Sequence, residues 1–250
     1  MGFKKLSDIK KYENTGILVK FLKAEYVNSL IEGKLFMNRM GFFIDLEKKK
    51  NSKGQGDKYE GAYVAPVEQG YLISPETNKV FGTFKKGTQT RRYKNVKKVP
   101  IFCCTIFYSS DLHVVNETAT SVTVQVKLSE EQKKNLLKDF GEKAVVLPNY
   151  FLDKVDDAVA KENLEWRHGP VQYVDHGVWS EERKVAFDKA SDNMFFWKDK
   201  YFEYQQEYRI AIINKFVKSY FELLIGDINQ KSIVMDTTAF FEEFTVEFPK

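Results

Sequence analysis

Three polar residues, Gln205, Glu207 and Arg209, follow one another at every second position late in the chain. In an extended strand, residues two apart point to the same face. An amide, a carboxylate and a guanidinium are therefore expected side by side, with Tyr208, Ile210 and Ile212 on the buried side. Such a polar face needs water or a ligand. This strand is the first candidate for a binding or catalytic site.

Two features weigh against the simplest alternative, in which this face is an ordinary solvated strand surface. The preceding segment, residues 194–202, is rich in Phe, Tyr and Trp and is too apolar for a solvated edge. A second polar cluster, Asp57 and Glu60, lies between Gly56 and Gly61 after a stretch rich in lysine and glycine. Because loops of this kind often face ligands, we expect this one to do so as well.

The composition excludes several classes of protein. The chain has 250 residues, and 43% of them are hydrophobic, which is enough for a large core. Its 39 basic and 35 acidic residues give a net charge of +4, too small to argue for nucleic-acid binding. The adjacent Cys103 and Cys104, in an apolar segment, suit inert thiols better than a disulfide framework or a zinc site. With no signal-peptide pattern and no apolar run of membrane-spanning length, we expect a cytoplasmic protein without a membrane partner.

Hydrophobic periodicity predicts an α+β fold. Besides the strand with Gln205 and Glu207, apolar patterns predict strands at 16–22, 34–38, 41–47, 63–67, 70–73, 80–84, 101–108, 121–126, 171–174, 221–225 and 244–248. Helical patterns occur at 23–32, 129–141, 150–163 and 180–190. The expected architecture is a single domain over 1–250, with a core of mixed or antiparallel sheet, flanking helices and a helical insertion at about 129–190. Residues 48–57 lack periodicity and are expected to form a mobile loop.

Several short motifs occur in an order that a known group of proteins shares. They are a first strand with Lys20 and Phe21, a Gly-Asp-x-x-Glu loop at 56–60, Lys198, and Tyr-Gln-Gln-Glu-Tyr-Arg at 204–209. This order resembles an uncharacterised family of bacterial and phage proteins whose fold is similar to that of the ADP-ribosyltransferases. The resemblance covers residues 16–61, 102–109 and 194–226. It implies an ADP-ribosyltransferase-like fold.

The resemblance also implies a site. In ADP-ribosyltransferases a late Glu binds the nicotinamide ribose of NAD and stabilises the oxocarbenium-like transition state, and Glu207 matches it here. A Gln or Glu two residues earlier helps to choose the acceptor, and Gln205 matches that position. The residues implied in binding the dinucleotide are Lys20, Phe21, Asp57, Glu60, Ser109, Lys198, Tyr204 and Arg209. The acceptor of ADP-ribose would be a host protein or a nucleic acid, in a conflict between phage and host.

Two positions depart from the pattern of these enzymes. A His or Arg on the first strand usually binds NAD, but the nearest candidates in this chain are Lys20 and Lys23, and lysine lacks the planar fork of arginine. The polar position on the central strand stays open between Thr105, Tyr108 and Ser109. A non-enzymatic or counter-defence protein that holds a nucleotide signal or a nucleic acid in the same cleft is therefore the alternative.

A basic segment at 85–98 is a separate candidate. It holds seven Lys and Arg among fourteen residues. Such a segment can contact phosphates or nucleic acid, with Phe84 and Tyr93 as stacking partners. A solvated basic hairpin is the simpler interpretation.

Overall fold

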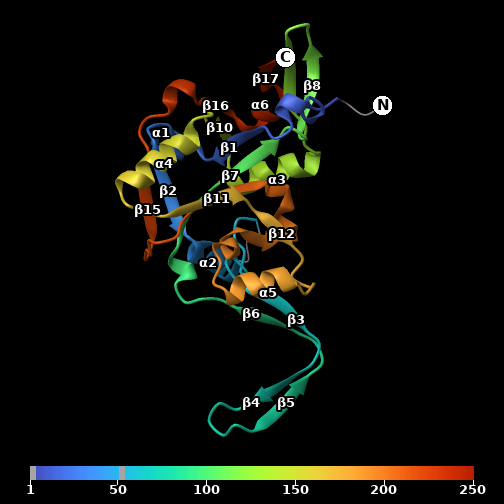
Figure 1. Ribbon diagram of the computed structural model, residues 1–250, viewed down its shortest axis with the longest axis vertical. Helices are drawn as coiled ribbons and strands as arrows, with labels where there is room; N and C mark the ends of the chain where they lie inside the picture. Colours follow the sequence, from blue (N-terminus) through green and yellow to red (C-terminus); the bar gives the residue numbers. More distant parts are fainter. Residues whose placement is uncertain (1–3, 51–53) are drawn as a thin grey trace.

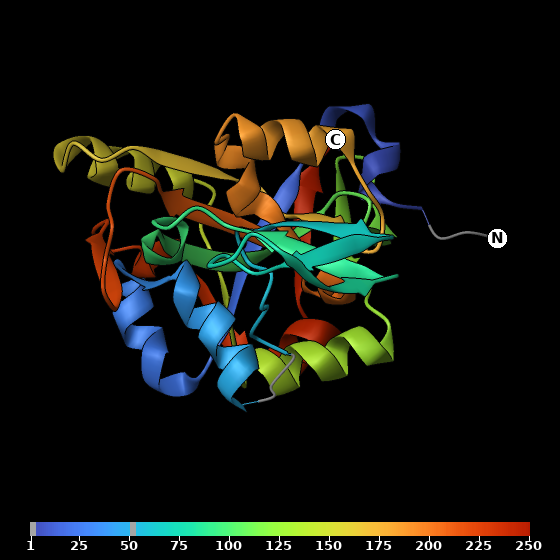
Figure 2. The same cartoon turned by 90° about the horizontal axis from the view of Figure 1, so that it is seen from below.

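The computed structural model describes residues 4–50 and 54–250 and has an α+β fold with mostly antiparallel strands (Figure 1). Its helices are α1 (Val27–Ile31), α2 (Met40–Lys50), α3 (Glu130–Phe140), α4 (Phe151–Lys161), α5 (Glu181–Asp188) and α6 (Thr237–Glu242). In the view along the long axis, α4 and α5 lie on one side of the molecule, and α2 and α3 lie on the other (Figure 2).

The central sheet has eight strands. Six of them follow the order β11 (Trp166–Pro170), β14 (Glu207–Ile212), β7 (Pro100–Tyr108), β1 (Gly16–Leu22), β10 (Lys143–Val146) and β16 (Ile233–Asp236). The other two, β2 (Lys34–Arg39) and β15 (Tyr220–Leu224), pair with each other, and β2 also pairs with β7. A separate two-stranded parallel sheet consists of β12 (Gln172–Val174) and β13 (Trp197–Asp199).

The central sheet divides at β7. On one side, β14 pairs with β7 from Ile101 to Thr105. On the other side, β1 pairs with the second half of β7, from Thr105 to Tyr108, whereas β2 pairs with Pro100 and Ile101. Residues 102–104 lie between these two pairings. Strands β1 and β2 therefore diverge from one common neighbour.

The two faces of the sheet bury different kinds of side chain. One face packs against α1 and α4 in an apolar core that includes Tyr208 and Ile210. On the opposite face, Glu207 and Arg209 lie between an apolar cluster around Phe107 and another that contains Ile101. The two polar residues thus interrupt an otherwise apolar layer.

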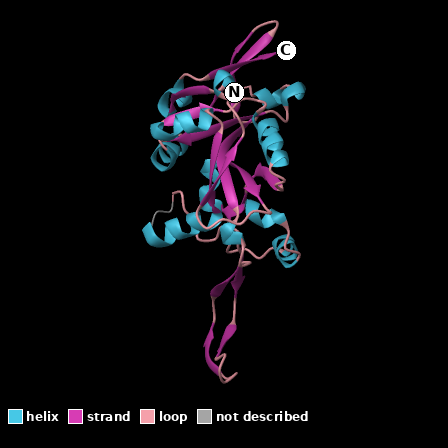
Figure 3. Ribbon diagram, turned by 90° about the vertical axis from the view of Figure 1, so that its left-hand side faces the viewer, coloured by secondary structure: helices cyan, strands magenta, loops and turns pink. Residues whose placement is uncertain are grey.

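A two-stranded ribbon, residues 63–91, extends away from the body of the molecule (Figures 1 and 3). We call it the arm. It begins with the pair β3 (Tyr63–Val67) and β6 (Gly87–Arg91) and continues through the pair β4 (Gly70–Ile73) and β5 (Val80–Phe84). At the opposite end, β8 (Leu112–Glu117), β9 (Ser121–Val126) and β17 (Thr245–Pro249) form a three-stranded sheet.

Two expected strand assignments are wrong. Residues 41–47 belong to helix α2, in which Met40 and Ile44, four residues apart, are both fully buried, as the helical period requires. Gln205 does not share a strand with Glu207. It ends a 3-10 helix, Lys200–Gln205, and the left-handed backbone of Gln206 (φ 42°) separates that helix from β14.

Two other segments also differ from expectation. Residues 129–190 contain α3, α4 and α5, but they also supply β10 and β11 to the central sheet, so the segment is more than a helical insertion. The expected mobile loop at 48–57 begins inside α2, and positions 51–53 lie outside the described residues.

Gly33→Ala should destabilise the protein. Gly33 joins α1 to β2 with a φ of +84°, and a Cβ there would lie 2.0 Å from the carbonyl oxygen of Gly226. The left-handed conformation alone costs a side chain about 1–2 kcal/mol, and the clash adds to this. The free energy of unfolding, measured by chemical denaturation, should fall by at least that amount.

Gly169→Ala in β11 is the matched control, since no heavy atom lies within 4 Å of the added Cβ. Its free energy of unfolding should stay within about 0.5 kcal/mol of the wild type. Equal stability of the two variants would contradict the role of Gly33.

Candidate functional site

Because β1 and β2 diverge, residues 102–104 of β7 have no neighbour among the described strands on that edge. A side chain contacts the backbone there instead. The ammonium of Lys20, on β1, donates a hydrogen bond to the carbonyl oxygen of Cys103. The same ammonium lies 4.8 Å from the centroid of the Phe102 ring. Because Cys103 lies between the two strand pairings, Lys20 satisfies a carbonyl that a neighbouring strand would otherwise bond.

A cleft of about 480 Å³ opens at this point. The volume is within the range of small-molecule sites, which combine apolar walls with a few polar groups. Its aromatic lining consists of Phe21, Tyr26, Phe36, Phe42, Phe43, Phe102 and Phe140. Its charged and amide lining includes Lys20, Lys23, Lys34, Glu60, Lys198, Gln205, Glu207 and Arg209. The cleft thus joins the loop at 56–60, strand β1 and strand β14.

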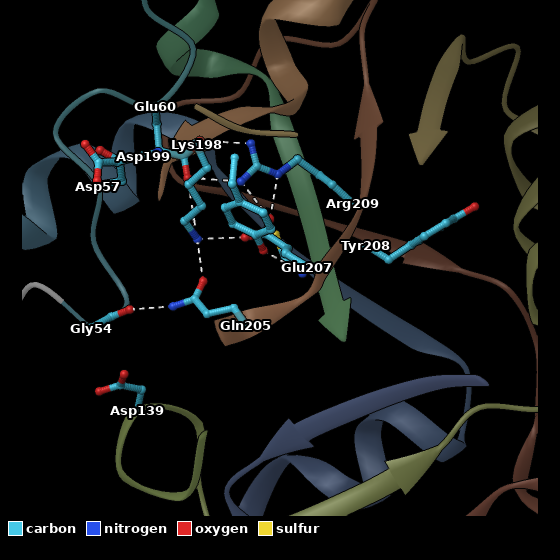
Figure 4. A network of polar contacts seen from close by, with 12 residues as sticks. Gly54, Asp57, Glu60, Asp139, Lys198, Asp199, Gln205, Glu207, Tyr208 and Arg209 are labelled. Carbon is cyan, nitrogen blue, oxygen red and sulfur yellow. Dashed lines mark hydrogen bonds and ion pairs between the residues drawn. The ribbon is translucent and has the colours of Figure 1, made fainter. Parts of the chain in front are cut away.

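Glu207 is the centre of a buried network of charges (Figure 4). Lys198 donates to its Oε2 at 2.7 Å, and the Nε of Arg209 donates to its Oε1 at 2.7 Å. Lys198 also donates to the Oε1 of Gln205 at 2.7 Å, so one ammonium holds the amide and the carboxylate together. All four residues are at most 5% exposed. These internal contacts satisfy the groups for which the sequence predicts water or a ligand.

Glu60 completes the network from the segment that leads into the arm. Its carboxylate accepts two hydrogen bonds from the guanidinium of Arg209, at 2.8 and 3.0 Å, a bidentate arrangement that fixes both side chains. Arg209 also donates to the carbonyl oxygen of Phe195 at 2.6 Å. The backbone carbonyl of Glu60 accepts from Arg92 at 2.9 Å. The guanidinium of Arg209 therefore joins the distant Glu60 to two neighbouring segments of the chain, at Phe195 and at Glu207.

Local turns of the backbone bring these side chains together. Asp57 accepts hydrogen bonds from two backbone amides, including that of Asp199 at 3.3 Å, and so ties the loop to the segment before β14. The left-handed turn at Gln206 directs the side chain of Gln205 towards Lys198, although Gln205 is not on the strand. The Gln205 amide also donates to the carbonyl oxygen of Gly54 at 2.8 Å.

The charges in the network stabilise one another. Burial alone would raise the pKa of Glu207, but the positive charges of Arg209 and Lys198 outweigh it and hold that pKa well below its ordinary value. Burial would likewise lower the pKa of Lys198, yet Glu207 and Glu60 keep it above the ordinary value. Burial raises the pKa of Glu60, against the opposing charges of Arg209 and Lys198. Glu207 is therefore an ionised carboxylate at neutral pH.

The structure divides the residues implied in dinucleotide binding into three groups. Those that line the cleft are Lys20, Phe21, Glu60, Lys198 and Arg209, together with Gln205 and Glu207. Asp57 and Tyr204 instead support it, since the Tyr204 hydroxyl donates to Asp139 and accepts from the Gln205 amide. Ser109 lies away from the cleft, at the turn after β7, where its hydroxyl donates to the carbonyl oxygen of Glu13 at 2.7 Å.

The sequence does not identify Tyr173 or Cys103 as residues of the site, and it leaves Thr105 as one of three candidates on the central strand. The hydroxyl of Tyr173 accepts the backbone amide of Glu207 at 2.7 Å. Cys103 lies opposite Arg209 in the register, and Thr105 lies opposite Glu207, so these are the residues of β7 that share the face of the network. Burial raises the pKa of both thiols, that of Cys104 to about 12, as expected for inert cysteines. The i, i+2 spacing of Cys103 and Thr105 within an apolar run is the signal that could have identified this face.

Over residues 4–50 and 54–250, no helix is long and apolar enough to cross a membrane. In the same part of the chain, no group of three or more His, Cys, Asp or Glu side chains could hold a metal ion. Comparison with protein-family models, curated proteins and solved structures found no match for this chain. Its function must therefore be inferred from the chemistry of the site.

Arg209→Met should destabilise the fold strongly. The substitution leaves Glu60 and Glu207 buried without the guanidinium that neutralises both. Removing one partner from a buried charge network costs about 3–5 kcal/mol. Denaturant-induced unfolding should show a loss of this size. Lys184→Met, which breaks an exposed pair with Asp188, is the control and should change little. A loss as small as that of the control would contradict the proposed role of Arg209.

The stabilising effect of Glu207 should depend on pH. Since its folded-state pKa lies below the ordinary value of 4.5, the ionised carboxylate stabilises the fold at neutral pH. That contribution is lost as the pH falls below 4.5 towards the lower folded value. The difference in unfolding free energy between the wild type and Glu207→Gln should therefore be largest at neutral pH and shrink on acidification. A difference that grows in acid would contradict this assignment.

Proposed function

We propose that this chain binds a nucleotide or dinucleotide in the cleft between β1 and β2. The observation that carries the proposal is the combination of aromatic walls, three lysines outside the buried network (Lys20, Lys23 and Lys34) and a fixed carboxylate around a cleft of about 480 Å³. Planar bases suit aromatic walls, phosphates suit lysines, and ribose hydroxyls suit polar groups such as Gln205 and Glu207.

The aromatic wall supports binding of a base. Phe36 stacks on Tyr220 with ring centroids 4.6 Å apart, and both rings remain about half exposed. Tyr26 and Phe42 are also partly exposed on the lining of the cleft. A nucleotide base can stack on such exposed rings without displacing other side chains. One stacked base contributes about 1–3 kcal/mol of binding free energy.

The lysines support binding of phosphate. Lys20 donates a hydrogen bond to a neutral carbonyl, and an ammonium has three donors. Lys34 is paired with Glu32, and Lys23 lies 3.9 Å from Glu25, but both pairs are exposed and solvent weakens them. Among the described residues, no buried carboxylate neutralises Lys20, Lys23 or Lys34. These ammonium groups are therefore available to a phosphate in the cleft.

Transfer of ADP-ribose from NAD to a host protein or nucleic acid, in a conflict between phage and host, is the second candidate function. Gln205 and Glu207 favour it, because Lys198 holds them together on the lining of the cleft, in line with the resemblance to ADP-ribosyltransferases. Against it, both oxygens of Glu207 already accept hydrogen bonds from Arg209 and Lys198. Glu207 would have to release one of these donors to bind a ribose hydroxyl. A nucleotide-binding role requires no such exchange.

Thermal-shift measurements with AMP, ADP-ribose and NAD test the proposed binding. A ligand at one hundred times its dissociation constant adds about 2.7 kcal/mol of stability, so at least one of the three should raise the melting temperature. Phe36→Ala should weaken binding roughly tenfold through the lost stacking. Trp179→Ala, which removes a similarly exposed aromatic ring that is not part of the cleft lining, should leave the affinity unchanged.

The proposal would be contradicted if none of the three ligands raised the melting temperature. It would also be contradicted if the two variants weakened binding equally. Nicotinamide release separates the two functions. Release from NAD that is lost in Glu207→Gln would identify transfer, whereas binding without release would identify a protein that holds its ligand.

A further inference from the structure

The arm exposes an unusual number of large apolar side chains at its tip. Phe81 is 70% exposed, and Tyr71, Leu72, Ile73 and Val80 are each between 44% and 61% exposed. They belong to the β4–β5 pair, the part of the arm farthest from the body (Figures 1 and 3). A folded chain rarely leaves such a cluster in water unless it contacts a partner.

The arm and the segment that follows it also carry the positive charge of the chain. Residues 63–98 contain eight Lys and Arg but only two Glu, a formal charge of +6, whereas the whole chain is +4. Six of these cations are exposed lysines: Lys79, Lys85, Lys86, Lys94, Lys97 and Lys98. In the part of the chain that the structure describes, no carboxylate lies within ion-pair distance of any of the six, whereas Arg91 has Asp188 at 3.8 Å.

The root of the arm is fixed to the body. Arg92 donates to the carbonyl oxygens of Glu60 and Lys58, both at 2.9 Å. Tyr93 stacks on Phe187 and donates to its carbonyl oxygen, so this ring is used internally and does not serve as the stacking partner that the sequence predicts. The arm therefore projects from a rigid base.

We propose that the arm is a binding element for duplex DNA. A two-stranded ribbon fits a groove of B-form DNA, and unpaired lysines along it can neutralise phosphates. Apolar side chains at a tip can insert between base pairs and kink the duplex. Phe81, the most exposed of the cluster, is the residue assigned to that insertion.

The charge of the arm favours DNA over other binding partners. A second copy of this chain that paired arm to arm would bring one cluster of unpaired lysines against another. An apolar protein partner would cover the tip but would leave these lysines without a role. Duplex DNA is a polyanion whose stacked base pairs offer apolar faces to an inserted side chain, so it matches both features at once.

Affinity for short duplex DNA, measured with the full chain over a range of salt concentrations, tests this role of the arm. Wild-type binding should weaken with salt. The triple variant Lys79→Gln, Lys85→Gln, Lys86→Gln should make the slope of log K against log salt shallower by about 2.7, or roughly 0.9 for each phosphate that a lysine no longer neutralises. The matched control, Lys134→Gln, Lys138→Gln, Lys161→Gln, removes the same charge from exposed positions on α3 and α4. It should leave the slope unchanged.

A tip variant separates insertion from charge. Phe81→Ser should lower the affinity roughly tenfold, as loss of one stacked ring does, without altering the salt slope. It should also abolish DNA bending measured by fluorescence transfer between the duplex ends. Because Phe81 is exposed, this substitution leaves the core intact, and an unchanged melting temperature would verify that.

Three results would overturn the proposal. One is absence of duplex binding at low salt, and another is a triple variant that behaves like its control. The third is self-association in sedimentation experiments that Phe81→Ser abolishes while DNA binding is absent, which would identify a second copy of the chain as the partner. None of these results depends on nucleotide binding in the cleft, so they leave that proposal untouched.

Discussion

The architecture around the cleft depends on the burial of Arg209. Its guanidinium is fully buried, and it bonds Glu60, the backbone of Phe195 and Glu207 on its own strand. A buried charge is tolerated only when its partners are in place with good geometry. The loop before the arm, the 3-10 helix Asp192–Phe196 and β14 must therefore assemble together. That assembly forms the wall of the cleft that contains Glu60, Glu207 and Arg209.

The same constraint shapes what the site can do. The oxygens of Glu207 accept hydrogen bonds from Arg209 and Lys198, so its negative charge is fixed in position and the network is complete without a ligand. Lys20 is less constrained, because the Cys103 carbonyl that it bonds is neutral. A rigid carboxylate beside an adjustable cation suits selective binding of a phosphorylated ligand. Catalysis would require part of the network to open.

The sequence predicts the strands of the site better than the contacts, the helix α2 and the turn around them. The alternation along Glu207–Ile212 predicts β14 and its apolar side, and the helical pattern at 129–141 predicts α3. No pattern reveals that Arg209 meets Glu60, because that contact spans 149 residues. The apolar run in α2 was ambiguous, since short runs fit a strand or a buried helix equally well. The turn at Gln206 depends on tertiary contacts that outweigh local preference.

A crystal structure of the chain soaked with ADP-ribose would test the central claim most directly. The account predicts ligand density between β1 and β2, with the base against Phe36 and Lys20 moved from the Cys103 carbonyl to a phosphate. It also predicts that the contacts of Arg209 with Glu60 and Glu207 stay as they are. Ligand bound elsewhere, or an empty cleft with Lys20 still on Cys103 at saturating ligand, would contradict it.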